Sequence, residues 1–166
     1  MSHILVVYYS RTGNTHRAAS AIARACGADL ERIHDHRSRA GFWGYIRSAH
    51  EALKAKPGKI RQAKQDPAKY DLVVLGSPVW TGHMSSPMRR YLLDHSGRLS
   101  RIAVFVTEGG RGGPRVLSEM ATLARRRPLA KLELRAAELR GDLADEVAHF
   151  VTAIQRAAAD AGAKVA

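Results

Sequence analysis

Short apolar runs rich in β-branched residues alternate along the chain with segments of helical spacing, and this alternation limits the folds open to it. Runs at residues 4–9, 72–76 and 102–106 are bounded by Gly, Ser, Thr or Asp, which is typical of strands buried on both faces. A weaker run lies at 29–33. The fifth, around 129–135, alternates leucine with charged residues, so we expect a half-exposed strand at a sheet edge.

Apolar residues recur at helical spacing between these runs, in four segments. They are Ala18, Ala19, Ile22, Ala23 and Cys26; Met88, Tyr91 and Leu92; Val116, Leu117, Met120 and Leu123; and Leu143, Val147, Phe150, Val151 and Ile154. Strands that alternate with helices over short connections predict right-handed crossovers and an α/β fold with a parallel sheet between two helical layers. With 166 residues, 45% of them hydrophobic, the chain is expected to form one domain over residues 1–166.

The segment at 34–69 is longer than a simple crossover. Its apolar residues predict a helix at about 41–55, followed by a polar loop up to Pro67; they are Phe42, Trp43, Tyr45, Ile46, Ala49 and Leu53. We favour packing of these aromatic side chains on the sheet. A dimer surface or a lid over a ligand is the alternative.

The chain is strongly basic, with a formal net charge of +12 and a pI near 10.5. Such a charge favours an anionic partner, such as nucleic acid, a membrane surface or an acidic protein. No nucleic-acid recognition motif accompanies it, so we favour a solvated basic surface. We expect the single cysteine, Cys26, to be a buried structural thiol. Neither a signal peptide nor an apolar membrane span is recognised, which predicts a cytoplasmic protein.

Three polar loops follow the first, third and fourth expected strands. They are Ser10, Arg11, Thr12, Gly13, Asn14 and Thr15; then Ser77, Pro78, Val79, Trp80, Thr81 and Gly82; then Thr107, Glu108, Gly109, Gly110, Arg111, Gly112 and Gly113. The carboxyl ends of parallel strands meet at one edge of a sheet, where ligands bind next to the point at which strand order reverses. We therefore expect the three loops to form one ligand site.

Each loop offers different chemistry to a ligand. In the first, hydroxyls, a glycine and backbone N–H groups converge on a helix N-terminus, which favours a phosphate; an ordinary capped helix start is the alternative. The second is a turn stiffened by Pro78 that presents Trp80, and the third has glycines whose backbone can lie close to a flat ligand. Together they predict a nucleotide-like ligand with a planar ring.

Other phosphate sites lack their required residues here. No lysine of a Walker loop lies near residues 10–15, and the fingerprint of dinucleotide-binding folds is absent. Cys26 lies in a helix rather than at a strand end, which excludes a cysteine phosphatase, and Tyr8–Ser10 lacks the acidic residues of a metal-binding receiver domain. The histidines show no metal-ligand spacing, so no metal site is predicted.

These loops resemble those of the flavodoxin-like family, whose members bind flavin mononucleotide (FMN). Residues 10–15 are similar to its phosphate loop, 77–82 followed by 87–92 to its first flavin loop and the next helix, and 105–110 to its second flavin loop. The resemblance implies a three-layer, doubly wound fold whose five-stranded parallel sheet has the order 2-1-3-4-5. It also implies FMN as cofactor, with residues 10–15 on the phosphate and the other two loops beside the isoalloxazine ring.

Two departures from that family bear on function. Electron-carrier flavodoxins are acidic, whereas this chain is basic, and Glu108–Gly110 offers no aromatic ring to stack on the flavin. One face of the ring is then open to a substrate, to Trp43 or to a partner subunit. We therefore expect an FMN-dependent oxidoreductase of the NAD(P)H:acceptor type, passing electrons to a quinone-like molecule or a redox protein.

Two alternatives remain: a non-enzymatic carrier for an acidic redox partner, and a membrane-surface flavoprotein similar to protoporphyrinogen oxidase. A homodimer is one option for its oligomeric state. Because the flavin supplies the chemistry, no catalytic side chain is predicted. Trp80 either stacks on the flavin or plugs the floor of its loop, and Arg11 faces the phosphate or solvent. For His83 we favour an exposed loop position over a hydrogen bond to the ring.

Overall fold

The computed structural model describes residues 3–36 and 57–163. In chain order the elements are β1 (Ile4–Tyr8), α1 (Asn14–Cys26), β2 (Asp29–Arg32), the 3-10 helix η1 (Pro67–Lys69), β3 (Leu72–Trp80), β4 (His83–Met84), α3 (Ser86–His95), η2 (Ser96–Arg98), β5 (Arg101–Glu108), α4 (Gly113–Ala124), β6 (Lys131–Arg135), η3 (Glu138–Arg140) and α5 (Ala144–Ala163).

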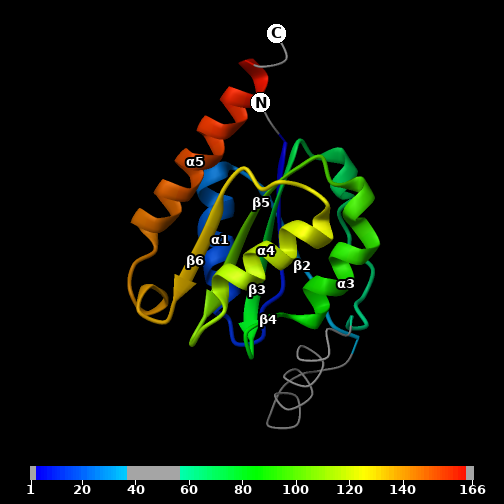
Figure 1. Ribbon diagram of the computed structural model, residues 1–166, viewed down its shortest axis with the longest axis vertical. Coiled ribbons are helices and arrows are strands. Elements are labelled where there is room, and N and C mark those ends of the chain that lie inside the picture. The colour runs from blue at the N-terminus through cyan, green and yellow to red at the C-terminus, as the bar shows by residue number, and fades with distance from the viewer. Residues whose placement is uncertain (1–2, 37–56, 164–166) are drawn as a thin grey trace.

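The sheet has the order β2-β1-β3-β5-β6, and these five strands are all parallel. Numbered among themselves they run 2-1-3-4-5, as the resemblance implied. Helices α1 and α5 lie together on one face of the sheet, and α3 and α4 lie together on the other (Figure 1). Strand order reverses between β1 and β3, which predicts a ligand site outside the carboxyl ends of these two strands.

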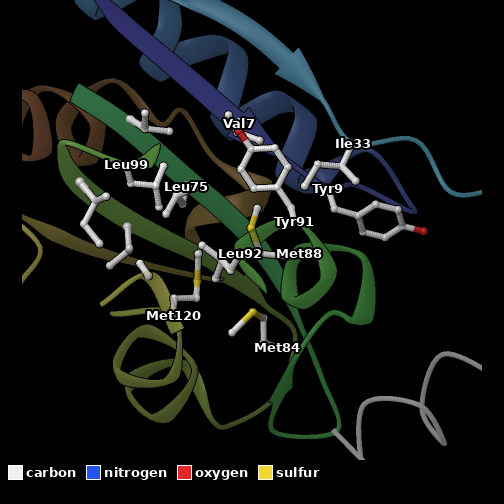
Figure 2. Close-up of a cluster of buried hydrophobic side chains, with 14 of the residues drawn as sticks. Val7, Tyr9, Ile33, Leu75, Met84, Met88, Tyr91, Leu92, Leu99 and Met120 are labelled. Carbon is white, nitrogen blue, oxygen red and sulfur yellow. The ribbon is translucent and has the colours of Figure 1, made fainter. Parts of the chain in front are cut away.

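The three inner strands, β1, β3 and β5, are mainly apolar because each has a core on both faces. Val7 and Leu75 belong to the core beneath α3 and α4, where Met88 and Met120 also lie (Figure 2). The adjacent Val6 faces the other core, beneath α1 and α5. Successive side chains of a strand point to opposite faces, so a strand between two helical layers is apolar on both of its faces over most of its length.

The edge strand and the polar connection agree with the sequence prediction. Among the strands that the structure describes, β6 pairs only with β5, and it is half exposed. Residues 57–66 form a polar loop joined to the end of β2 by a bridge between Asp35 and Ile60. The predicted helix at 41–55, with Trp43, lies outside the described residues. Within the described ranges no helix has the length and apolar character required to span a membrane.

Two predicted boundaries and one predicted burial were wrong. β3 continues to Trp80 and β5 to Glu108, so Ser77–Trp80 and Thr107–Glu108 are strand rather than loop. Both strands lie inside the sheet and keep pairing with each other as far as Pro78 and Thr107. Cys26 is half-buried at the last turn of α1 rather than enclosed, and partial burial raises the pKa of its thiol.

Candidate functional site

The three loops predicted from the sequence meet at one cavity of about 460 Å³ outside the carboxyl ends of β1, β3 and β5. Eleven of the sixteen predicted site residues line it: Arg11, Thr12, Asn14, Thr15, Pro78, Val79, Trp80, Thr81, Thr107, Glu108 and Gly109. The other five, Ser10, Gly13, Ser77, Gly82 and Gly110, do not line it but belong to the same loops. The topology therefore brings together residues that lie far apart in the sequence.

The first loop turns sharply into α1 at Gly13, whose φ of 101° lies in the left-handed region that favours glycine. The Gly13 N–H donates to Ser10 Oγ over 3.1 Å, so this buried serine holds the turn together. No side chain caps α1, and its first turn contains no acidic residue. Its first N–H groups and the positive end of its dipole remain available to an anion.

A buried hydroxyl pair joins the first loop to the third. Thr15 Oγ1 lies 2.8 Å from Thr107 Oγ1, and both side chains line the cavity. On the other side of the first loop, Arg32 Nη2 donates to the Ser10 carbonyl over 3.1 Å. These contacts tie the first loop and the start of α1 to β2 on one side and to the end of β5 on the other.

The second loop is a two-residue hairpin, which was not predicted from the sequence. Trp80 pairs with His83 across the turn, in which Thr81 has a φ of 49° and Gly82 a φ of 75°. Two successive positive φ values are typical of the type I′ turn of tight hairpins. The Trp80 and Tyr9 rings make a T-shaped contact, with their centroids 5.5 Å apart and their planes at 89°. The indole is thereby held at the cavity wall, whereas His83 lies in β4 and does not line the cavity.

Ser77 has a structural contact instead of a position in the cavity. Its hydroxyl lies 3.0 Å from Ser85 Oγ, is buried completely, and accepts a hydrogen bond from the Ser85 N–H over 3.1 Å. These bonds close the base of the hairpin between β3 and the start of α3. A serine at this position therefore shapes the second loop.

The third loop contacts the second through glycine. A Cβ on Gly112 would lie 2.6 Å from Gly82 Cα, and Gly112 has a φ of 117°, so both the close approach and the backbone angle require glycine. The buried carboxylate of Glu108 accepts a hydrogen bond from the Gly113 N–H at the start of α4 over 2.9 Å. Burial, and secondarily a hydrogen bond with Glu133, raise the pKa of Glu108 above its usual range.

A fourth loop, missed from the sequence, completes the cavity. It follows β6 and contributes Ala136, Leu139 and Arg140. Ligands bind at the carboxyl ends of parallel strands, and this rule applies equally to the loop after the fifth strand. The same rule could therefore have identified the fourth loop from the sequence. Among the described residues no cluster of three His, Cys, Asp or Glu side chains suits a metal ion.

The structure is similar to those of known flavoproteins. A flavoprotein from Lactobacillus acidophilus, solved in complex with FMN, superposes with a TM-score of 0.71 at 21% identity, over 84% of this chain and 97% of the other. A WrbA-like flavodoxin from Agrobacterium tumefaciens gives a TM-score of 0.60 at 16% identity, over 95% and 98% of the two chains. These similarities concern the fold.

Sequence comparison adds a more specific relative. The NAD(P)H dehydrogenase (quinone) of Archaeoglobus fulgidus is 32% identical over 114 residues, which are 60% of this chain and 53% of that protein. The match therefore spans about half the length of this relative. The family model described as flavodoxin matches residues 3–133, which is most of the sequence. With its flavodoxin-like sheet order and this match, the chain belongs to the flavodoxin family.

Proposed function

We propose that this chain binds FMN in the cavity at the carboxyl edge of the sheet and acts as an FMN-dependent oxidoreductase. The observation that carries the proposal is the meeting of an uncapped helix N-terminus, a hairpin that presents an indole ring and a glycine loop around one cavity of about 460 Å³. The FMN complex of the Lactobacillus acidophilus flavoprotein, which has the same fold, supports this choice of cofactor.

The residues present suit both ends of FMN. The backbone N–H groups of residues 12–15 and the side chains of Thr12 and Asn14 would hold the phosphate, because they lie at the positive end of α1. Trp80 and the third loop, which contains Gly109 and Gly110, would hold the flavin ring. Trp80 offers a flat apolar ring, and the glycines leave the backbone free of side chains. Bound FMN would supply the redox chemistry, namely acceptance of a hydride and transfer of electrons.

The reaction we propose is electron transfer from NAD(P)H to a quinone-like acceptor or a redox protein. The printed name of the Archaeoglobus fulgidus relative supports this class of reaction. The side chains of this chain would bind and orient the two substrates, and the Tyr9–Trp80 contact would fix one wall of the cavity while they exchange.

FMN binding is tested by titrating the stripped protein with FMN and with riboflavin, which lacks the phosphate, and following flavin fluorescence. In Asn14→Asp, a carboxylate replaces the exposed amide at the first residue of α1. We expect FMN affinity to fall about ten-fold or more through charge repulsion, with riboflavin affinity unchanged. The fold should not be weakened, because an acidic residue is favourable in the first turn of a helix.

Asn14→Ala is the matched control, because it removes the amide without adding charge and should therefore weaken FMN binding less. Failure of the unaltered protein to bind either flavin would refute the cofactor assignment. Equal loss of FMN and riboflavin in Asn14→Asp would place the phosphate elsewhere in the cavity.

Enzymatic activity is tested by following oxidation of NADH and NADPH by the FMN-loaded protein with a soluble quinone. Turnover that depends on both the nucleotide and the quinone supports the reductase. Inactivity with small molecules, combined with salt-sensitive binding to an acidic redox protein, supports an electron carrier instead, for which the net charge of +12 is the relevant observation. Sedimentation of the protein together with anionic lipid vesicles would support the membrane-surface flavoprotein.

A further inference from the structure

The loop after β6 is attached directly to the helix that begins at the phosphate loop. Arg17 lies at the end of the first turn of α1, and its Nη1 donates to the Leu139 carbonyl over 2.7 Å. Its Nη2 donates to the Gly141 carbonyl. One guanidinium thus binds the carbonyls on both sides of Arg140, so that this residue is held beside the N-terminus of α1.

Arg140 lines the same cavity as Arg11, Thr12 and Asn14. Its guanidinium has no hydrogen bond or ion pair in the part of the chain that the structure describes, although its backbone N–H is bonded to Ala137. Among the described residues that line the cavity, Glu108 is the one acidic residue, and its carboxyl group already accepts a hydrogen bond from the Gly113 N–H. Arg140 is therefore a cation held at an anion-favouring helix end, and within residues 3–36 and 57–159 no carboxylate is paired with it.

We propose that Arg140 binds the phosphate of the ligand in this cavity, and that Arg17 is the residue that positions it. The inference rests on the proposed binding of FMN. A guanidinium presents several N–H donors in a rigid fork that matches two phosphate oxygens. Arg140 would thus add charge-assisted hydrogen bonds from a fourth loop to those from the first turn of α1.

The experiment compares Arg140→Ala with Arg156→Ala in the titrations of the stripped full-length chain with FMN and with riboflavin. Both residues are exposed, so each variant loses one positive charge at the surface. Arg156 lies in α5 well beyond its first turn, and that helix runs away from the strand ends that surround the cavity (Figure 1). It therefore controls for the change in net charge.

We expect Arg140→Ala to weaken FMN binding about ten-fold or more, while riboflavin binding stays unchanged. Arg140→Lys should recover part of the loss, because lysine keeps the charge but lacks the fork. Arg156→Ala should bind FMN like the unaltered protein. Thermal melts of the stripped proteins verify that each variant is folded.

Arg17 is tested by a double-mutant cycle. If it acts only by holding the loop after β6, Arg17→Ala should weaken FMN binding, and Arg17→Ala combined with Arg140→Ala should bind no more weakly than Arg140→Ala alone. Additive losses would mean that Arg17 contacts the ligand independently, which overturns its positioning role.

Two outcomes overturn the role of Arg140. The first outcome is that Arg140→Ala binds FMN with the same affinity as Arg156→Ala. This result would leave the proposed binding of FMN standing. The other is an equal loss for FMN and riboflavin, which assigns Arg140 to the flavin ring rather than the phosphate. Failure of the unaltered protein to bind FMN is a different result and refutes the proposed function instead.

Discussion

At the scale of single residues, Thr81 is in an unfavourable backbone conformation. It is β-branched, has a φ of 49° and lies at the tip of the β3–β4 hairpin beside the cavity. Such a residue in the left-handed region costs about 1–3 kcal/mol, whereas asparagine adopts it readily. We expect Thr81→Asn to raise the free energy of unfolding by about 1 kcal/mol, as measured by urea denaturation of the stripped protein.

The Thr81 hydroxyl also donates to the Trp80 carbonyl over 2.7 Å, and this bond needs its own control. Thr81→Ser keeps the hydroxyl but removes the branched carbon, so it should also be more stable than the unaltered protein. A loss of stability in Thr81→Asn together with no gain in Thr81→Ser would show that the hairpin is not strained at this position.

At the scale of elements, the N-terminus of α4 is held by the carboxyl group of Glu108, whose pKa is raised. Burial, then a hydrogen bond with Glu133, raise the pKa of Glu108, so the folded state binds this proton more tightly than the unfolded chain. The contribution of Glu108 to stability therefore falls as pH rises from the usual glutamate pKa of about 4.3 through its raised folded-state value.

Glu108→Gln imitates the protonated carboxyl, because its amide oxygen can still accept from the Gly113 N–H. We expect the free energy of unfolding of the variant, relative to the unaltered protein, to increase between pH 4 and pH 7, two values that lie below and above the usual glutamate pKa of about 4.3. Urea denaturation across this range measures the difference. The prediction fails if the difference between the two proteins is independent of pH, or if it decreases.

At the scale of the whole molecule, the net charge of +12 should affect the redox properties of bound FMN. Positive surroundings stabilise negative charge, and fully reduced FMN is an anion. We therefore expect a less negative potential for the final reduction than in an acidic flavodoxin. A dye-coupled redox titration measures this potential, and raising the salt concentration, which screens the surface charge, should make it more negative. A strongly negative potential that salt does not alter would contradict the charge argument.

Much of the fold could be predicted because its signals are local. The runs at 4–9, 72–76 and 102–106 became the buried strands β1, β3 and β5, and alternation at 129–135 became the edge strand β6. Strand ends were less predictable. Pairing with neighbouring strands decides where β3 ends. The hairpin beyond it needs positive φ values at two residues, and a threonine at position 81 gives no sign of such a φ value in the sequence.

The sequence by itself determined the α/β class, the edge strand and the three segments that meet at the cavity, because each depends on neighbouring residues. Only the tertiary structure decided which of those residues reach the cavity. Ser77 bonds to Ser85, and Ser10 holds a turn. Arg140 follows β6, about 125 residues further along the chain than the loop at residues 10–15, and Arg17 holds the backbone on both sides of it next to that loop. Such contacts arise when distant segments pack together, so no pattern along the chain records them.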